Sequence, residues 1–222
     1  MWPAEEPTDP RVIYPDYDSD PERWKSWQPR QDVHETVASE LSGPILDVGC
    51  GEGRLASLLG GRVPWIGVDA SHTQLATIPH RPVVLADMRM LPFRDGVFAE
   101  VAHLWCLYHV NDPVVAVREA WRVLRSGGRY YASTAARNND PEIMWEGYPP
   151  TPFDAEEAGA IVASVFEHVE PQHWDGRYFL LQTRDEVRAY FRHHYIPAER
   201  AEVAELPLWL TKRGVLVRAT KD

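Results

Sequence analysis

The chain has 222 residues, of which 44% are hydrophobic and 25% charged, and its formal net charge is −10. This length and composition predict a globular domain that can bury a sizeable core. The acidic balance disfavours nucleic acid as a partner, because affinity for nucleic acid depends largely on Lys and Arg.

Targeting and redox features point to a cytoplasmic protein. The first ten residues, MWPAEEPTDP, lack the basic and apolar regions of a signal peptide. No stretch approaches the 18 uninterrupted apolar residues of a membrane span. The two cysteines, Cys50 and Cys106, are too few for a disulfide framework.

The first two-thirds of the chain alternate between strand and helix patterns. Residues 1–29, rich in proline, aspartate and aromatic residues, predict an irregular arm with one helical turn near residues 21–27. A helix is expected over residues 30–41, with Gly43 as its stop. The strands expected next cover residues 45–48, 65–68, 82–86, 100–107 and 129–134, and the helices between them residues 54–59, 72–78 and 113–124. One face of the last helix is expected to carry Val114, Val117, Ala120, Trp121 and Leu124. The alternation implies right-handed crossovers and a doubly wound α/β fold with a parallel sheet.

Beyond residue 135 the pattern is less regular. Four prolines make residues 136–153 a loop. Helices are expected over residues 154–165 and, after a capping box, 184–194, and strands over residues 167–174, 178–181 and 215–219. The roughly 40 residues before the last strand are too many for a hairpin, so we expect them to cover the active site.

The sequence ILDVGCGEGRLA, residues 45–56, predicts a strand, a tight turn and the start of a helix. Its glycines can adopt positive φ and let a ligand approach the backbone, where the helix presents N–H groups. The dinucleotide fingerprint would need glycine where the chain has Arg54, and no G-K-[ST] follows for a P-loop. A carboxylate at Asp47 also suits an ammonium group better than a pyrophosphate. NAD is therefore less favoured, though an NAD-linked reductase remains an alternative.

The pattern D-x-G-x-G-x-G resembles motif I of the class I S-adenosylmethionine (SAM)-dependent methyltransferases. The segments ILDVGCGEG, VDAS, LADMRMLPF and WCLYHVNDP leading into REAWRVLRSGG, between residues 45 and 134, are similar to the methyltransferase type 11, or UbiE-like, branch. The resemblance implies a Rossmann-like sheet of seven strands, the last antiparallel, with helices on both faces. SAM would lie across the carboxyl ends of strands one and four, as in other open α/β sheets.

The resemblance also implies roles for particular residues. Asp47 would hold the methionine ammonium group. Asp69, placed like the ribose-binding acid of Rossmann folds, would accept from both ribose hydroxyls. Asp87 would accept from the adenine amino group, with the backbone N–H of Met88 donating to the ring. The full set of expected cofactor contacts is Asp47, Gly49, Cys50, Gly51, Gly53, Asp69, Ala70, Asp87, Met88, Leu104 and Trp105.

The strand-four segment departs from its relatives. Many of them have Asn where this chain has Leu104, and a His-His pair where it has Tyr108 and His109. The segment therefore differs from the N-P-P-Y motif that places a target amine, which disfavours adenine in nucleic acid as the acceptor. A general base is needed only if the acceptor must lose a proton. His109 is the first candidate, because imidazole titrates near neutral pH, and Tyr108 is the second. His109 could instead hydrogen-bond at the next helix start. No residues show convincing metal-ligand spacing.

Aromatic residues outside the expected elements are candidates for the acceptor site. Those of the N-terminal arm could close over the cofactor, and those of the proline-rich loop could line a pocket. The candidates are Tyr14, Tyr17 and Trp24 in the arm, and Trp145 and Tyr148 in the loop. The arm could equally cover a sheet edge or a partner copy, which leaves a homodimer open.

The resulting prediction is a single SAM-dependent methyltransferase domain over residues 1–222. It comprises an arm and helix (1–43), a SAM-binding core (44–135) and a substrate-side part (136–222). The expected acceptor is a small molecule methylated on oxygen or nitrogen, from specialised metabolism. A SAM-binding partner or sensor without transferase activity is the alternative.

Overall fold

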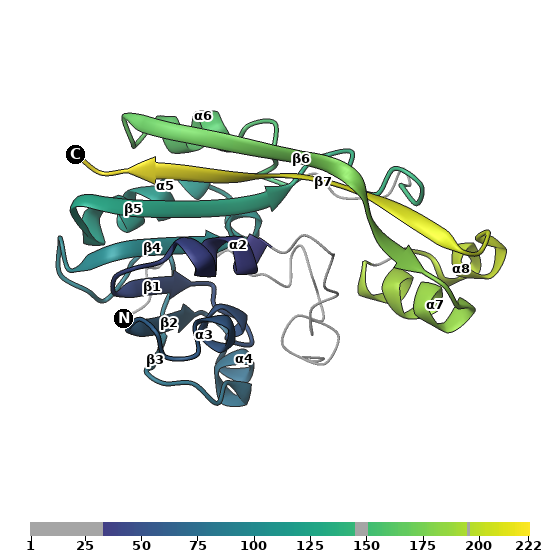
Figure 1. The fold of residues 1–222 in the computed structure, drawn as a ribbon, viewed down its shortest axis with the longest axis horizontal. Coiled ribbons are helices and arrows are strands. Elements are labelled where there is room, and N and C mark those ends of the chain that lie inside the picture. The colour runs from purple at the N-terminus through teal and green to yellow at the C-terminus, as the bar shows by residue number, and fades with distance from the viewer. Residues whose placement is uncertain (1–32, 145–150, 195) are drawn as a thin grey trace.

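The computed structural model describes residues 33–144, 151–194 and 196–222 (Figure 1). Within them, one sheet has the strand order β3-β2-β1-β4-β5-β7-β6. Pairing is parallel from β3 to β5, and β7 runs antiparallel to both β5 and β6. The strands are β1 Ile45–Val48, β2 Trp65–Asp69, β3 Val83–Leu85, β4 Phe98–Leu104, β5 Leu124–Ala135, β6 His168–Leu181 and β7 Leu208–Thr220. The predicted doubly wound fold with an antiparallel last strand is confirmed.

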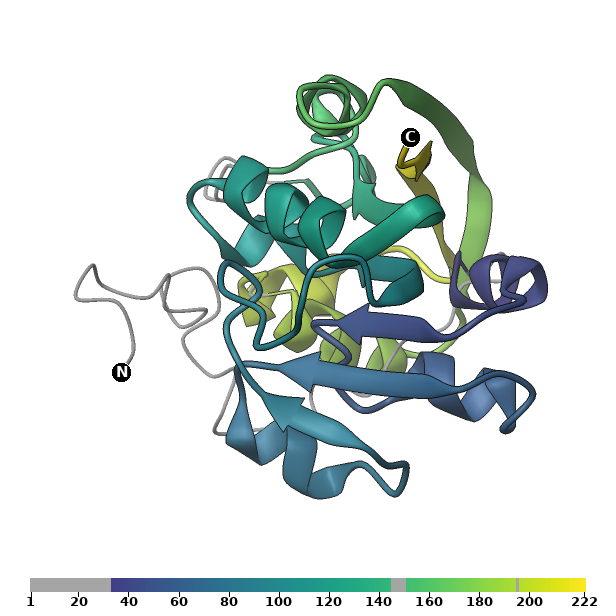
Figure 2. The same ribbon diagram turned by 90° about the vertical axis from the view of Figure 1, so that its left-hand side faces the viewer.

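Helices cover both faces of the sheet (Figure 2). One face packs against α2 Val33–Glu40, α3 Arg54–Leu59 and α4 His72–Thr77, and the other against α5 Pro113–Val123 and α6 Ala158–Ala163. The carboxylate of Asp112 accepts from the backbone N–H of Val114 and so caps α5, and Ser71 caps α4 in the same way. Both helices therefore begin at the N-cap residues that the sequence predicted.

The prediction for the end of α5 is wrong in two respects. The helix stops at Val123, and β5 begins at Leu124 without a loop, so Leu124 belongs to a strand. Trp121 is 40% exposed, because the buried stripe of α5 runs through other positions and Trp121 lies beside it. The ammonium group of Lys221 lies 3.8 Å from the centroid of its ring.

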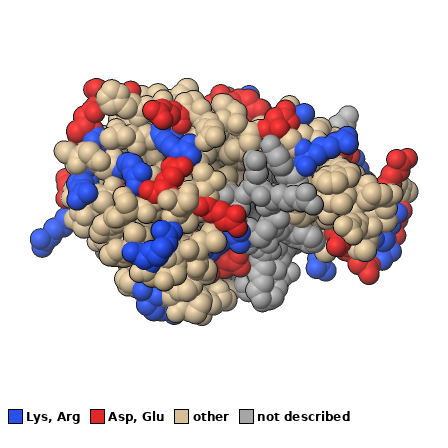
Figure 3. Space-filling model, in the orientation of Figure 1, with Lys and Arg blue, Asp and Glu red and all other residues tan. Residues whose placement is uncertain are grey.

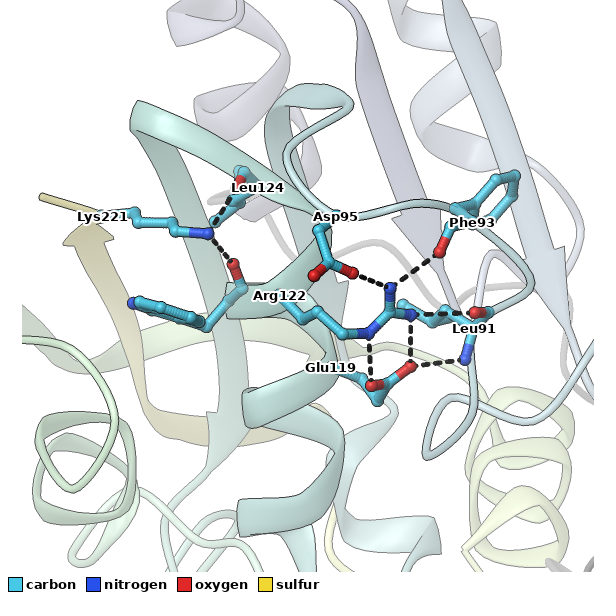
Figure 4. A network of polar contacts seen from close by, with 8 residues as sticks. Leu91, Phe93, Asp95, Glu119, Arg122, Leu124 and Lys221 are labelled. Atoms are coloured by element: carbon cyan, nitrogen blue, oxygen red, sulfur yellow. Dashed lines mark hydrogen bonds and ion pairs between the residues drawn. The ribbon is translucent and has the colours of Figure 1, made fainter.

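Arg122 on α5 fixes the loop that connects β3 to β4 (Figure 4). Its guanidinium donates to the carboxylates of Glu119 and Asp95 and to the backbone carbonyls of Leu91 and Phe93. Glu119 in turn accepts from the N–H of Leu91 at 2.8 Å. The predicted adenine-binding segment lies at the start of this loop. The contacts from α5 therefore also help to fix the position of that segment.

Strands β6 and β7 form a long antiparallel hairpin that projects beyond the rest of the sheet (Figure 1). The two short strands expected at residues 167–174 and 178–181 are one strand, and β7 is much longer than predicted. Pairing of β7 with β5 ends at Gly214, and residues 208–213 continue with β6 alone. The connection carries α7 Arg184–His193 and α8 Ala198–Val203, which pack on a core of their own. Residues 182–207, which contain both helices, connect two strands that pair with each other. The prediction that this connection is too long to join a pair of antiparallel neighbours is therefore wrong.

A buried polar cluster ties the loop after β5 to this hairpin. Asp140, with a positive φ of 53°, accepts from the hydroxyl of Tyr190 at 2.7 Å and from the ammonium of Lys212 at 2.6 Å. The Lys212 side chain is only 15% exposed, and its burial lowers its pKa while Asp140 opposes that shift. The cluster therefore places an ion pair beside the hydrophobic core formed by α7, α8 and the ends of β6 and β7.

The surface in Figure 3 carries charged side chains of both signs, which are interspersed over this face. Among the described residues, no helix is both long and apolar enough to cross a membrane, and no three His, Cys, Asp or Glu side chains are grouped as metal ligands would be.

Candidate functional site

The glycine loop lies between β1 and α3 and is fastened to the neighbouring strand. The N–H groups of Gly49 and Cys50 both donate to the carbonyl of Val68, at 2.7 and 3.0 Å. The N–H of Gly51 donates to the carboxylate of Asp69 at 2.9 Å. The loop therefore sits at the carboxyl ends of β1 and β2.

The three glycines of the loop serve different purposes. A Cβ on Gly49 would lie 2.5 Å from the Cβ of Cys106, and one on Gly53 would lie 2.9 Å from a methyl group of Ile78. These two positions are glycine because the protein itself fills the space. At Gly51, with φ of 50°, no described residue beyond its chain neighbours places an atom within 4 Å of such a Cβ. Gly51 is thus the position that leaves room for a ligand against bare backbone.

Asp47 lies on β1 beneath this loop and is 4% exposed. The indole Nε1 of Trp65 donates to its Oδ2 at 3.0 Å. Burial raises the pKa of Asp47 to about 6, although this hydrogen bond and the nearby His34 act in the opposite direction. A cation brought beside Asp47 would therefore relieve an unfavourable buried charge.

Asp69 ends β2 and is held by backbone groups on both sides. Its Oδ1 accepts from the N–H of Ser71 and its Oδ2 from that of Gly51, each at 2.9 Å. The carboxylate is fixed and buried, and a carboxylate can accept several hydrogen bonds, including bonds from hydroxyl groups. Ala70 beside it is exposed.

Asp87, after β3, forms an ion pair that the sequence did not predict. The guanidinium of Arg89 donates to both carboxylate oxygens, with Nη2 2.6 Å from Oδ2, and the Arg89 N–H donates to Oδ1 at 2.8 Å. The carboxylate expected to face an adenine amino group is thus already largely engaged by an arginine fork. Met88, half-buried, lies 4.0 Å from where a Cβ of Gly49 would be.

Strand β4 ends at Leu104, three residues earlier than predicted, and Trp105 turns the chain with a φ of 60°. A bulky residue in this region is strained, and such strain gathers at functional sites. The Sγ of Cys106 donates to the carbonyl of Val48 at 3.2 Å, which joins this turn to the glycine loop. Both cysteines are buried free thiols.

The ring of Trp105 meets that of Trp174 from β6 edge-on, with centroids 5.9 Å apart. Trp174 pairs with Gly214 on β7, where a Cβ would clash with its ring, and Gly214 pairs with Ala135, the last residue of β5. The two half-buried indoles therefore lie together at the carboxyl edge of the sheet.

Tyr108 and His109 belong to a short 3-10 helix, Leu107–His109, with ring centroids 4.6 Å apart. The expectation that His109 titrates near neutral pH is wrong, because burial lowers its pKa to about 4. The imidazole is neutral at working pH and is a weak base there.

The structure thus brings together the residues predicted at the ends of β1, β2 and β4. The predicted acceptor-site residues Tyr14, Tyr17, Trp24, Trp145 and Tyr148 lie outside the described residues. Sequence reasoning missed Trp65, Arg89 and Trp174. Two glycines were the available signal: Gly67, two residues after Trp65 on β2, and Gly214, opposite Trp174 on β7, since a strand glycine often marks close approach of another group.

Comparison with known proteins agrees with this geometry. Residues 46–132 match a family model described as methyltransferase domain. A demethylmenaquinone methyltransferase from Symbiobacterium thermophilum is 31% identical over 132 residues, which are 52% of this chain and 51% of that protein. The chain spans between 28% and 51% of the length of the first relatives that it matches.

Two solved structures share the fold. Phosphoethanolamine N-methyltransferase 2 of Haemonchus contortus, in complex with S-adenosyl-L-methionine, aligns with 99% of this chain and 61% of its own, at a TM-score of 0.68 and 13% identity. The 4+2 cyclase SpnF aligns with 97% of both chains, at a TM-score of 0.67 and 18% identity.

Proposed function

We propose that the protein is a class I SAM-dependent methyltransferase, which transfers the methyl group of SAM to an oxygen or nitrogen of a small-molecule acceptor; the match of residues 46–132 to the methyltransferase-domain family model supports this. The observation that carries the proposal is the space that the described residues leave open at Gly51, whose N–H donates to the buried carboxylate of Asp69 in the loop that follows the buried Asp47. These groups match the needs of SAM, which offers an ammonium group and ribose hydroxyls.

Each residue of this edge has a task in the proposed reaction. SAM supplies a methyl group that is electrophilic because it is bound to a sulfonium, and the transfer is an in-line displacement at carbon. Asp47 accepts from the ammonium group, and Asp69 accepts from the ribose hydroxyls. The Gly51 backbone leaves the space between them free. Since the chemistry is intrinsic to the methyl donor, positioning and exclusion of water are what these residues contribute.

The acceptor is proposed to bind beside the indoles of Trp105 and Trp174. They lie where β4 and β5 end, on the same edge as the cofactor groups. Apolar aromatic surface of this kind suits a small organic molecule. A net charge of −10 also favours small molecules over nucleic acid. Because the pKa of His109 is about 4, we assign it no role as a base and favour acceptors that react without losing a proton, such as a carboxylate or a neutral amine.

A second candidate function is SAM binding without methyl transfer. The likeness to SpnF, a cyclase by its name, extends over 97% of this chain, so the fold alone does not specify the reaction. Incubation with radiolabelled SAM and a panel of phenols, amines and carboxylates separates the two functions. Transfer of label supports the methyltransferase, and SAM binding without transfer to any acceptor class supports the alternative.

Calorimetry with SAM and its demethylated product tests the proposed site. We expect binding in the micromolar range, and loss of most of it in Asp69→Ala. Gly51→Ala should also abolish binding, because its methyl group enters the open space. Gly60→Ala is the matched control: Gly60 has a φ of 55° and similar open surroundings at the end of α3, so both variants carry the same strain of roughly 1 kcal/mol. Equal binding by the two variants would refute the site, and no binding by the wild type would refute the function.

A further inference from the structure

Trp65 occupies an unusual position under the glycine loop. It begins β2 opposite Ile45 of β1, and two residues later Gly67 stands opposite Asp47. A Cβ on Gly67 would clash with the Trp65 ring. Gly67 is therefore glycine to let the indole lie along its own strand, and the indole N–H reaches Asp47 on the neighbouring strand at 3.0 Å. The indole is 8% exposed, so the hydrogen bond is shielded from water.

This N–H acts within a small set of charged groups around Asp47. His34 faces it from α2 and favours its ionised form, whereas Asp69 at the end of β2 opposes ionisation. Glu52 in the glycine loop acts on His34. Burial raises the pKa of Asp47 to about 6, and the Trp65 hydrogen bond lowers it. Without the indole N–H, more of Asp47 would be protonated at neutral pH.

We propose that Trp65 is a positioning residue for the cofactor: its N–H orients the Asp47 carboxylate and favours the ionised form that accepts from the ligand's ammonium group. The inference rests on the proposed function, because it requires that Asp47 bind this ammonium group. Trp65 itself touches no ligand atom in this scheme. Its effect is confined to one end of the cofactor, which makes it separable from a general loss of structure.

The test uses Trp65→Phe, which keeps an aromatic ring over Gly67 and removes the N–H. Affinity for S-adenosylhomocysteine, which carries the ammonium group, is measured by calorimetry from pH 5 to 8. In the wild type, affinity should fall as the pH drops through about 6. In Trp65→Phe the midpoint should move upward by about one pH unit, which corresponds to about 10-fold weaker binding at pH values below both midpoints. Trp121→Phe, at an exposed indole, should leave the profile unchanged.

A ligand control separates positioning from packing. The compound 5′-methylthioadenosine has the adenosine part but no ammonium group, so its affinity should be the same in wild type and Trp65→Phe at every pH. Equal weakening of both ligands, or an unchanged midpoint for S-adenosylhomocysteine, would overturn the inference and leave the proposed function intact. Absence of binding by the wild type would overturn both.

A measurement on the wild type covers the case in which Trp65→Phe does not fold. The indole ¹⁵N–H resonance of Trp65 should titrate with a midpoint near pH 6, and the titration should disappear in Asp47→Asn. An indole resonance that is constant over this range would contradict the inference.

Discussion

Replacing Asp47 by Asn should separate the stability of the ligand-free protein from its function. Asp47 is a carboxylate on a core strand, and burial raises its pKa from 3.8 to about 6. The folded protein therefore holds a proton that the unfolded chain has lost between about pH 4 and pH 6. Stability must fall as the pH rises through this window, because the folded state binds the extra proton. Removing the ionisable group should make the protein more stable at neutral pH and unable to hold an ammonium ligand.

The magnitude follows from the size of the shift. A change of about 2 units, at about 1.4 kcal/mol for each unit, means that ionised Asp47 costs ~3 kcal/mol of folding free energy above pH 7. Asn also buries an amide, and any unmet hydrogen bond of that amide subtracts a constant amount at all pH values. The test of the raised Asp47 pKa is therefore how the difference in free energy of unfolding between Asp47→Asn and wild type changes with pH.

Urea denaturation of both proteins at pH 4.5, 6 and 8 measures this difference. The free energy of unfolding of Asp47→Asn relative to wild type should increase by ~2–3 kcal/mol between the lowest and highest pH. Glu205→Gln removes the same charge from an exposed position and is the control, with no pH-dependent gain expected. A difference between Asp47→Asn and wild type that does not change with pH would refute the assigned environment of Asp47.

Three further predictions concern the acceptor side and the hairpin. Trp174→Ala should raise the KM for an aromatic acceptor about 10-fold, since it removes one of the two indoles that meet edge-on at the proposed subsite, while SAM affinity stays unchanged; equal loss for an aliphatic acceptor would argue against the proposed subsite. At saturating SAM, kcat should show no acidic limb near pH 6.5 from His109, because its pKa is about 4; such a limb, lost in His109→Gln, would contradict this. Lys212→Met should lower the free energy of unfolding by ~3 kcal/mol, since it leaves Asp140 buried and unpaired. Adding Asp140→Leu should restore part of it in urea denaturation, and a double variant no more stable than the single would be evidence against the pairing.

The arrangement of the proposed cofactor edge was predictable because its signals are local in sequence. Asp47 and Asp69 each follow an apolar run, and the spacing of the glycines prescribes a turn between strand and helix. The ends of parallel strands then meet by topology, so contacts between distant segments followed without further information. The caps at Ser71 and Asp112 were predictable for the same reason.

What could not be predicted depends on side chains that meet across strands. The Trp65 hydrogen bond requires the register of β1 and β2, and the meeting of Trp105 with Trp174 requires a chain of pairings from β6 through β7 to β5. Periodicity fixes which face a residue occupies but not its partner on the next strand. Trp121 shows the converse limit: an aromatic residue near an apolar stripe was assigned to the core, although one step along the helix turned it outward.

The three aspartates at this edge show why residue type alone does not determine a role. Asp47 lies within β1, Asp69 ends β2 and Asp87 follows β3. Among the described residues, Asp87 is paired with a guanidinium, Asp69 accepts from two backbone N–H groups, and Asp47 accepts from an indole N–H. A carboxylate already paired with Arg89 gains little from another donor, whereas Asp47 keeps a costly buried charge. In the proposed site, the electrostatic driving force for a ligand is therefore concentrated at the end assigned to the ammonium group. We expect recognition at the end assigned to the adenine to rely more on shape and backbone contacts than on the acid at position 87.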